Sequence, residues 1–312
     1  MEENLFSKVL GRIACLISGL LLAACSKGAG SLLPSPLQTQ DTLIVISGDS
    51  NHSGITRYDM NGNSLGVVTN YRAAGGILRG AARFDSESFL VSLDTSDRIE
   101  KVYLDGRTEL FHGSAFLNGN LYGLALGSDN HYYQVESNRI EVVDLVGARQ
   151  AAKYVNTVEG GCTLNSPRNL IATDAGKLIV FDVGGTDNIH TYDISGSAPV
   201  CDSSVAFGQD PYAGVLHSDG FLYIVTQGND QIYRADPDGS NATVIWSTDT
   251  AVINNPTAIV EHPSGDLLVA SSATDSIERL QVDGTRVGTV PFIADTYSLN
   301  INEMIIQPGV EQ

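Results

Sequence analysis

Arginine and tyrosine side chains, which can hold an anionic or sugar-like ligand, recur in this sequence at regular intervals. Steps of 43 to 46 residues connect Arg79, Tyr122, Arg168, Tyr212, Thr257 and Glu303, the last as an approximate member of the series. A guanidinium group binds carboxylates through paired hydrogen bonds, and a tyrosine ring offers an aromatic face. If the six positions surround one axis, they form a ligand-binding site. The alternative is that these long side chains fill a pore and contact only one another.

Histidines recur in the same way. His217 and His262 each stand three residues before a glycine. Two imidazoles at equivalent positions suit a metal ion, but a repeat explains the pair without one. The sequence contains no HExxH, CxxC or Walker-type motif, and no Ser/His/Asp set can be singled out. We therefore predict no metal site and no cofactor, and we do not expect catalysis.

The elements that position these residues follow from an internal repeat. In six segments an isoleucine is followed seven residues later by a glycine, and the isoleucines are 44, 41, 49, 43 and 45 residues apart. In five segments an Asp or Asn stands two residues before the isoleucine, where its side chain suits a tight turn between strands. The isoleucines are Ile55, Ile99, Ile140, Ile189, Ile232 and Ile277.

Each repeat contains several short apolar runs without helical period. One run lies about ten residues before the isoleucine, as in Leu267–Val269; another precedes it, as in Ala258–Val260; a further run follows the glycine, as in Thr243–Trp246. Four short strands joined by Gly and Asx turns, repeated six times, predict an all-β protein, a six-bladed β-propeller with four-stranded blades.

The two ends of the repeat array complement each other. The first repeat begins with the run Thr42–Ile46 and lacks an inner strand, whereas the run Leu299–Ile306 is left over at the C-terminus. We expect this C-terminal strand to become the innermost strand of the first blade. The ring would then close without an open sheet edge.

Repeats four to six resemble NHL repeats, in which Pro-x-Gly, an apolar strand, an Asp-Gly turn and an Arg-Ile step recur. The matching residues are Pro167–Asn169, Pro211–Ala213, Pro256–Ala258, Asp219–Gly220, Arg98–Ile99, Arg139–Ile140 and Asp236–Gly239. Asn169, Ala213 and Ala258 replace the glycine after proline, so the chain is NHL-like. The plan is also similar to the lactonase and senescence-marker propellers and to TolB-type propellers. The lactonase resemblance implies a divalent metal held by Glu, Asn and Asp, for which Glu303, Asn165 and Asp210 are loosely placed.

The N-terminus has the pattern of a bacterial lipoprotein signal. The basic residues Lys8 and Arg12 precede an uncharged run from Ile13 to Ala24 that is too short to span a bilayer. The run ends in Leu22–Cys25, which resembles a lipobox. We therefore expect residues 1–24 to be a signal peptide, Cys25 to carry the lipid, residues 25–40 to form a flexible tether, and residues 41–312 to form the propeller. No Asp follows Cys25, which favours the outer membrane.

Export and charge limit the chemistry of the domain. The net charge is −18, and such an acidic protein repels nucleic acids. In an oxidising compartment, Cys162 and Cys201 are expected to form a disulfide, because Cys15 is removed and Cys25 is lipidated. We expect a monomer in the cell envelope, attached to the membrane by its lipid. Its predicted function is to bind a protein, peptide or glycan; the alternative is a metal-dependent hydrolase or lyase of the lactonase-like type.

The lipobox assignment makes a direct prediction. Replacing Cys25 by Ser removes the thiol that accepts the diacylglycerol, so the variant is expected to stay as unprocessed precursor in the inner membrane. Membrane fractionation with immunoblotting measures this outcome. Mature Cys25→Ser protein in the outer-membrane fraction would contradict the assignment.

Overall fold

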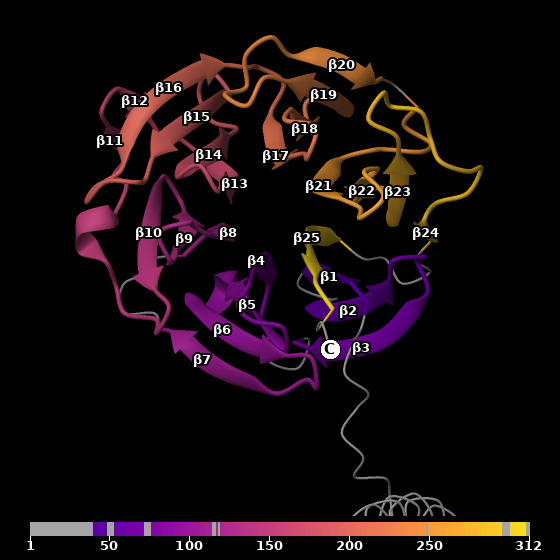
Figure 1. The fold of residues 1–312 in the computed structure, drawn as a ribbon, viewed down its shortest axis with the longest axis horizontal. Helices are drawn as coiled ribbons and strands as arrows, with labels where there is room; N and C mark the ends of the chain where they lie inside the picture. The colour runs from indigo at the N-terminus through magenta and orange to yellow at the C-terminus, as the bar shows by residue number, and fades with distance from the viewer. Residues whose placement is uncertain are drawn as a thin grey trace, which may run out of the picture. The chain divides into compact units, whose positions relative to one another are not determined.

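The computed structural model describes residues 40–48, 53–71, 76–113, 117, 119–247, 249–294 and 300–309. In this part of the chain, six small antiparallel sheets stand around one axis, as Figure 1 shows. The predicted six-bladed β-propeller is thus confirmed. The proposed signal peptide, Cys25 and almost all of the tether lie outside the described residues.

The inner two strands of each blade form the core of the ring. The innermost strands, in blade order, are β25 (Ile301–Gln307), β4 (Leu78–Arg83), β8 (Leu121–Leu126), β13 (Pro167–Ala172), β17 (Pro211–Leu216) and β21 (Pro256–Glu261). The second strands are β1 (Thr42–Gly48), β5 (Ser88–Leu93), β9 (His131–Glu136), β14 (Lys177–Asp182), β18 (Leu222–Thr226) and β22 (Leu267–Ser271). The second strands are almost continuously buried, because other blades cover both of their faces.

The outer strands are more polar. The third strands are β2 (Ser53–Asp59), β6 (Arg98–Tyr103), β10 (Arg139–Asp144), β15 (Asn188–Asp193), β19 (Gln231–Ala235) and β23 (Ser276–Leu280). The outermost are β3 (Ser64–Asn70), β7 (Thr108–His112), β16 (Val200–Ala206), β20 (Thr243–Trp246) and β24 (Ile293–Ala294). The third blade departs from the expected four strands: its described sheet has three, and isolated bridges to Arg149 and Val155 cover its edge.

Short elements connect the third and fourth blades. These are the 3-10 helix η3 (Ala151–Lys153) and the two-stranded sheet of β11 (Val158–Glu159) and β12 (Cys162–Thr163), whereas the 3-10 helix η2 (Asp94–Ser96) lies between β5 and β6 of blade two. Cys162 of β12 forms the predicted disulfide with Cys201 of β16, with a Cα–Cα distance of 5.8 Å. The bond therefore fastens this connection to the outer strand of blade four. No helix among the described ranges is long and apolar enough to cross a membrane.

The repeated isoleucine and glycine have separate physical roles. The six isoleucines are buried in the cores between blades. Gly106 and Gly147 adopt a left-handed backbone, with φ of 89° and 81°, which a side chain disfavours. A Cβ on Gly106 would also lie 2.6 Å from the carbonyl oxygen of Val68, and one on Gly147 would lie 2.1 Å from that of Phe111. Glycine thus allows the turn of one blade to pack against the outer strand of the blade before it.

The acidic residue before the isoleucine forms the turn as expected. Asp97, Asp187, Asp230 and Asp275 all have positive φ values, between 47° and 55°. Asp tolerates this conformation better than most residues. In the third blade the left-handed residue is Ser137 (φ 48°), one position before the predicted asparagine.

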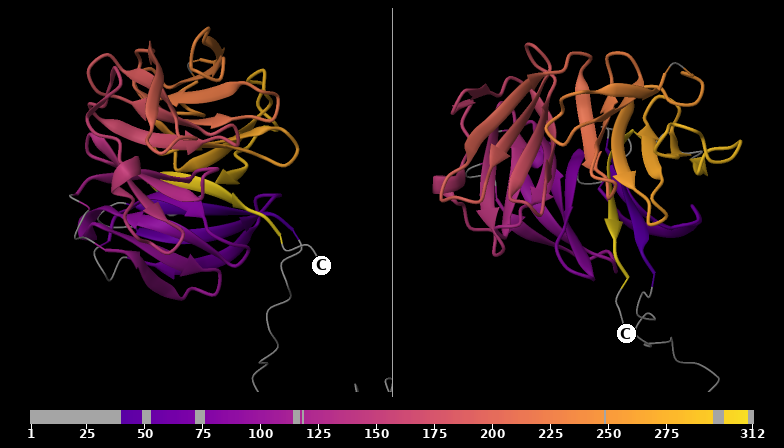
Figure 2. Two further views of the ribbon diagram at one scale, coloured as in Figure 1. Left: turned by 60° about the vertical axis from the view of Figure 1, so that its left-hand side comes forward. Right: turned by 45° about the horizontal axis from the view of Figure 1, so that its top comes forward.

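Ring closure joins the two ends of the repeat array. β25 pairs antiparallel with β1, from Thr42 opposite Gln307 to Ser47 opposite Ile301, and Figure 2 shows the two strands side by side. The predicted closure of the first blade by the C-terminal strand is therefore confirmed. Beside the end of β25, the backbone N–H of Gly309 donates to Asp41, so the described chain enters and leaves the propeller at one place.

Closure predicts a strong effect of truncation. Deleting residues 299–312 removes β25 and exposes the edge of β1, so the melting temperature is expected to fall by more than about 10 °C. Removing residues 310–312 alone is the control and should leave the melting temperature unchanged. Circular dichroism melts of both proteins measure the difference. Equal melting temperatures for the long truncation and the intact protein would contradict closure by β25.

Candidate functional site

All six inner strands carry a β-bulge at the same place. In β13, Pro167 pairs with Asp182 and Asn169 with Phe181, which leaves Arg168 as the extra residue. Equivalent register shifts occur near the start of the other inner strands. A bulge changes the direction of nearby side chains, so successive residues line the central channel. The second residues of the six strands, all at the bulge, are Arg79, Tyr122, Arg168, Tyr212, Thr257 and Asn302.

The recurring arginines and tyrosines are brought together, as the sequence predicted. Arg79, Tyr122, Arg168, Tyr212 and Asn302 surround one small gap in the channel; we call these five residues the plug. The guanidinium carbon of Arg168 lies 4.3 Å from the ring centre of Tyr122, and that of Arg79 lies 5.8 Å from it. Arg79 Nε also lies 3.5 Å from Asp94 Oδ2. These cation–π and ionic contacts link three neighbouring blades.

The plug leaves little free space. The gap among its side chains has a volume of about 10 Å³, roughly the least that admits one water molecule. This geometry is compatible with side chains that fill a pore. A ligand at this end would contact only the outward surfaces of the plug, which are half-buried. The binding of an anionic ligand by Arg79 and Arg168 stays a prediction.

The other two members of the predicted set, Thr257 and Glu303, are not part of the plug. The Thr257 hydroxyl donates to the carbonyl oxygen of Ile301 and so joins blade six to β25. The bulge in β25 places Asn302, and not Glu303, in register with the plug. The Asn302 amide donates to the carbonyl oxygens of Gly48 (2.8 Å) and Leu78 (2.6 Å), which connects blades one and two. Glu303 lies one layer deeper.

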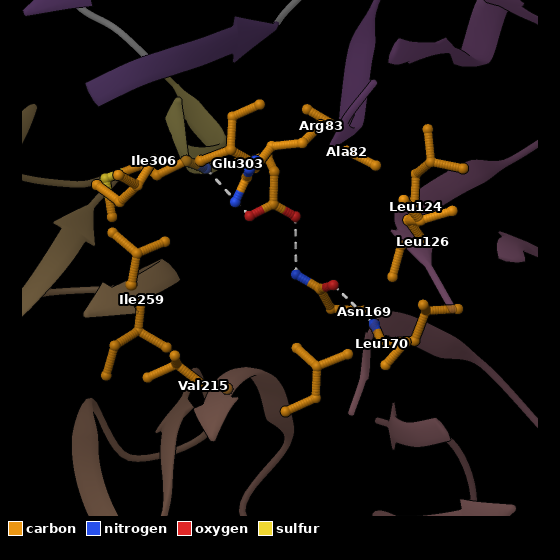
Figure 3. Close-up of a pocket in the computed structure, with 18 of the residues that line it drawn as sticks. Ala82, Arg83, Leu124, Leu126, Asn169, Leu170, Val215, Ile259, Glu303 and Ile306 are labelled. Carbon is orange, nitrogen blue, oxygen red and sulfur yellow. Dashed lines mark hydrogen bonds between the residues drawn. The ribbon is translucent and has the colours of Figure 1, made fainter. Parts of the chain in front are cut away.

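This deeper layer is formed by the third residue of each inner strand. Four of the six are small and two are large and polar; the six are Gly80, Gly123, Asn169, Ala213, Ala258 and Glu303. The Asn169 amide donates to Glu303 Oε2 at 2.9 Å, and Figure 3 shows the two side chains meeting across the channel. A Cβ on Gly123 would lie 2.5 Å from Asn169 Oδ1, so the small residues make room for this pair.

Glu303 has an uncommon environment for a carboxyl group. Its side chain is buried, with 8% of the residue exposed. Its oxygens accept hydrogen bonds from Asn169 and from the backbone N–H of Met304 at 3.0 Å. Among the described residues, no lysine, arginine or histidine forms an ion pair with it. Burial raises the pKa of Glu303 to about 7, because removal from water destabilises the charged form.

A cavity of about 550 Å³ lies beyond Glu303, on the side away from the plug. Figure 3 shows Leu124, Leu126, Val215, Ile259 and Ile306 around it, with Glu303 and Asn169 at its base. Its rim includes Arg83 and Asp85, at the end of β4. We call it the channel cavity. Its walls are formed by the inner strands after the bulge, and its base is closed by the Asn169–Glu303 layer and the plug.

The residues considered for a metal site do not form one. The imidazole Nε2 atoms of His217 and His262 lie 3.0 and 2.9 Å from the carbonyl oxygens of Gly265 and Met60 in the next blade. Their Nδ1 atoms face backbone N–H groups of their own turns. Both histidines therefore join neighbouring blades.

The set implied by the lactonase resemblance is also not assembled. Asn165 lies beside Thr163 and Gly184, and neither Asn165 nor Asp210 lines the channel cavity with Glu303. Within the described ranges, no group of three or more His, Cys, Asp or Glu side chains has the geometry to hold a metal ion. The donor set present does not fit a divalent metal.

Comparisons with known proteins support the fold. A scan against protein-family models and a search of the curated proteins find no match. Among solved structures, a nidogen/laminin complex superposes with a TM-score of 0.67 at 17% identity, covering 85% of this chain and 98% of that chain. A gluconolactonase from Xanthomonas campestris superposes with a TM-score of 0.55 at 16% identity, covering 85% and 89%.

A virginiamycin B lyase from Staphylococcus aureus gives a TM-score of 0.52 at 17% identity, over 67% of this chain and 68% of that chain. At these identities the likeness establishes the fold alone. The shared fold occurs in a protein complex and in enzymes, so it does not decide between binding and catalysis.

The environment of Glu303 predicts a pH-dependent stability. In the folded protein the pKa of the Glu303 carboxyl group is about 7, whereas the ordinary glutamate pKa is 4.5. Between these values the folded state binds more protons than the unfolded state, so its stability falls as the pH rises. Glu303→Gln cannot ionise and should gain up to about 3 kcal/mol over the unmodified protein between pH 4.5 and pH 8. Urea unfolding at both pH values measures this. If the free energies of unfolding of Glu303→Gln and the unmodified protein differed by the same amount at both pH values, the raised pKa of Glu303 would be contradicted.

Proposed function

We propose that this protein is a non-catalytic binding propeller of the bacterial envelope, anchored by a lipid on Cys25. Its channel cavity receives an apolar group of a protein, peptide or glycan partner. The observation that carries the proposal is the shape of the channel: the cavity of about 550 Å³ has an open mouth and a closed base. Its volume lies within the usual range for ligand sites, and mainly apolar walls with a few polar groups are typical of such sites.

The residues around the cavity support binding more than catalysis. The polar side chains that line it are Arg83, Asp85, Asn169 and Glu303. The lactonase-like alternative needs a metal-bound water, and covalent hydrolysis needs an activated side-chain nucleophile. The described residues that line the cavity include no serine, cysteine or histidine, and their donor set does not fit the metal of the lactonase-like alternative. The apolar wall offers contact area to a partner instead.

Filling the cavity provides the test. Val215 of β17 lines the cavity and points into it in Figure 3, so Val215→Trp should occupy the space that the partner needs. A partner captured from an envelope extract is then titrated against the purified mature protein. Loss of the buried apolar contact is expected to weaken binding about tenfold or more. The melting temperature is measured beside it, so that misfolding is recognised.

Two further variants locate the binding face. Val244→Trp alters an exposed valine on the outer strand of the same blade and should leave the affinity unchanged. Arg168→Ala alters the plug: under the present proposal it lowers the melting temperature and leaves the affinity intact. If Arg168→Ala abolishes binding while Val215→Trp does not, the partner binds at the plug, and the cavity proposal is wrong.

A further inference from the structure

The base of the channel cavity presents the carboxyl group of Glu303, which forms no ion pair with a lysine, arginine or histidine of the described chain. Each oxygen of Glu303 accepts one hydrogen bond, from Asn169 or from Met304, and an ionised carboxylate can accept about two on each oxygen. The arginines of the plug have partners elsewhere: Arg79 lies beside Asp94, and the guanidinium groups of Arg79 and Arg168 stack on Tyr122. Unused acceptor capacity is therefore left at an apolar wall.

A buried carboxylate without a cation is unfavourable, and a ligand that supplies the cation removes this penalty. We infer that the channel cavity binds a primary ammonium group on an apolar chain, with the ammonium against Glu303 and the chain along Leu124, Val215 and Ile259. The inference rests on the proposed function, since it names the ligand class of the same cavity. The net charge of −18 also raises the local concentration of cations near the protein.

The hydrogen bonds at the base favour an ammonium over other head groups. Asn169 already donates to Glu303, and its Oδ1 accepts from the N–H of Leu170. An ammonium offers three donors to the free lone pairs, whereas a carboxylate would repel Glu303. The rim works in the opposite sense, because the exposed Arg83 attracts anions. A comparison of head groups on one chain length therefore separates the base from the rim.

The experiment is isothermal titration calorimetry of the mature protein at pH 8 with n-octylammonium, n-octanol and n-octanoate, each below its aggregation concentration. Octylammonium is expected to bind about tenfold or more tightly than the other two, the usual effect of a charge-assisted hydrogen bond. Glu303→Gln should remove this preference and leave octanol binding within about twofold. Glu109→Gln, an exposed glutamate on β7, is the matched control and should behave as the unmodified protein.

Cavity-filling variants separate the two proposals. Val215→Trp and Ile259→Trp should each weaken all three probes, and the variant with the smaller change in melting temperature is the one interpreted. Suppose that octanol binds the unmodified protein as tightly as octylammonium does, and that both filling variants weaken the two probes equally. The cavity then binds apolar groups, but the ammonium inference is wrong. The ammonium inference is also wrong if octanoate binds more tightly than octylammonium. It is wrong, too, if neither the filling variants nor Glu303→Gln weakens the binding of octylammonium. Both outcomes count whatever the result with the envelope partner.

Discussion

The structure depends on the antiparallel pairing of β25 with β1. This pairing closes the ring, and it also delivers residues from the end of the chain to the centre of the molecule. Asn302 then bonds the carbonyl groups of Gly48 and Leu78, and Glu303 meets Asn169 from a strand 134 residues earlier. A propeller without its last strand would lose both the Asn302 side chain of the plug and the Glu303 carboxyl at the base of the cavity. Stability and the candidate site therefore share one cause.

The second determinant is the bulge repeated in each inner strand. In a regular strand, neighbouring side chains point to opposite faces, so Asn302 and Glu303 could not both face the same channel. One extra residue at the start of each strand breaks this alternation. The channel consequently has two adjacent layers of different chemistry: a plug of arginines and tyrosines, and a layer of small residues interrupted by Asn169 and Glu303. Beyond these layers the regular alternation resumes and the walls become apolar.

The repeat made most of the fold predictable. The isoleucine–glycine spacing located the third strand and the following turn in every blade, and the surplus C-terminal run located the closure. The disulfide followed from the two cysteines that would remain if Cys15 is removed with the expected signal peptide and Cys25 is lipidated. The bulge was not predictable, because a register shift of one residue depends on pairing with another strand; the sequence therefore suggested Glu303 where Asn302 stands. Asn169 was visible as a large residue at a position that is otherwise Gly or Ala in four repeats, but only the folded ring brings it to Glu303. The channel cavity depends on the radius of the ring, which no single repeat contains.

The place where the chain enters the propeller has a consequence for access. Asp41 and Gly309 meet at the end of β25, and Gln307 bonds the backbone of Asp85 at the cavity rim. With the lipid on Cys25, as proposed, about 16 residues separate the bilayer from this point, and they cannot reach farther than about 55 Å. The cavity mouth would then be held near the membrane surface and could be turned toward it. A ligand that partitions into the bilayer would reach the mouth by lateral diffusion in two dimensions, at a local concentration set by the lipid phase instead of the surrounding water.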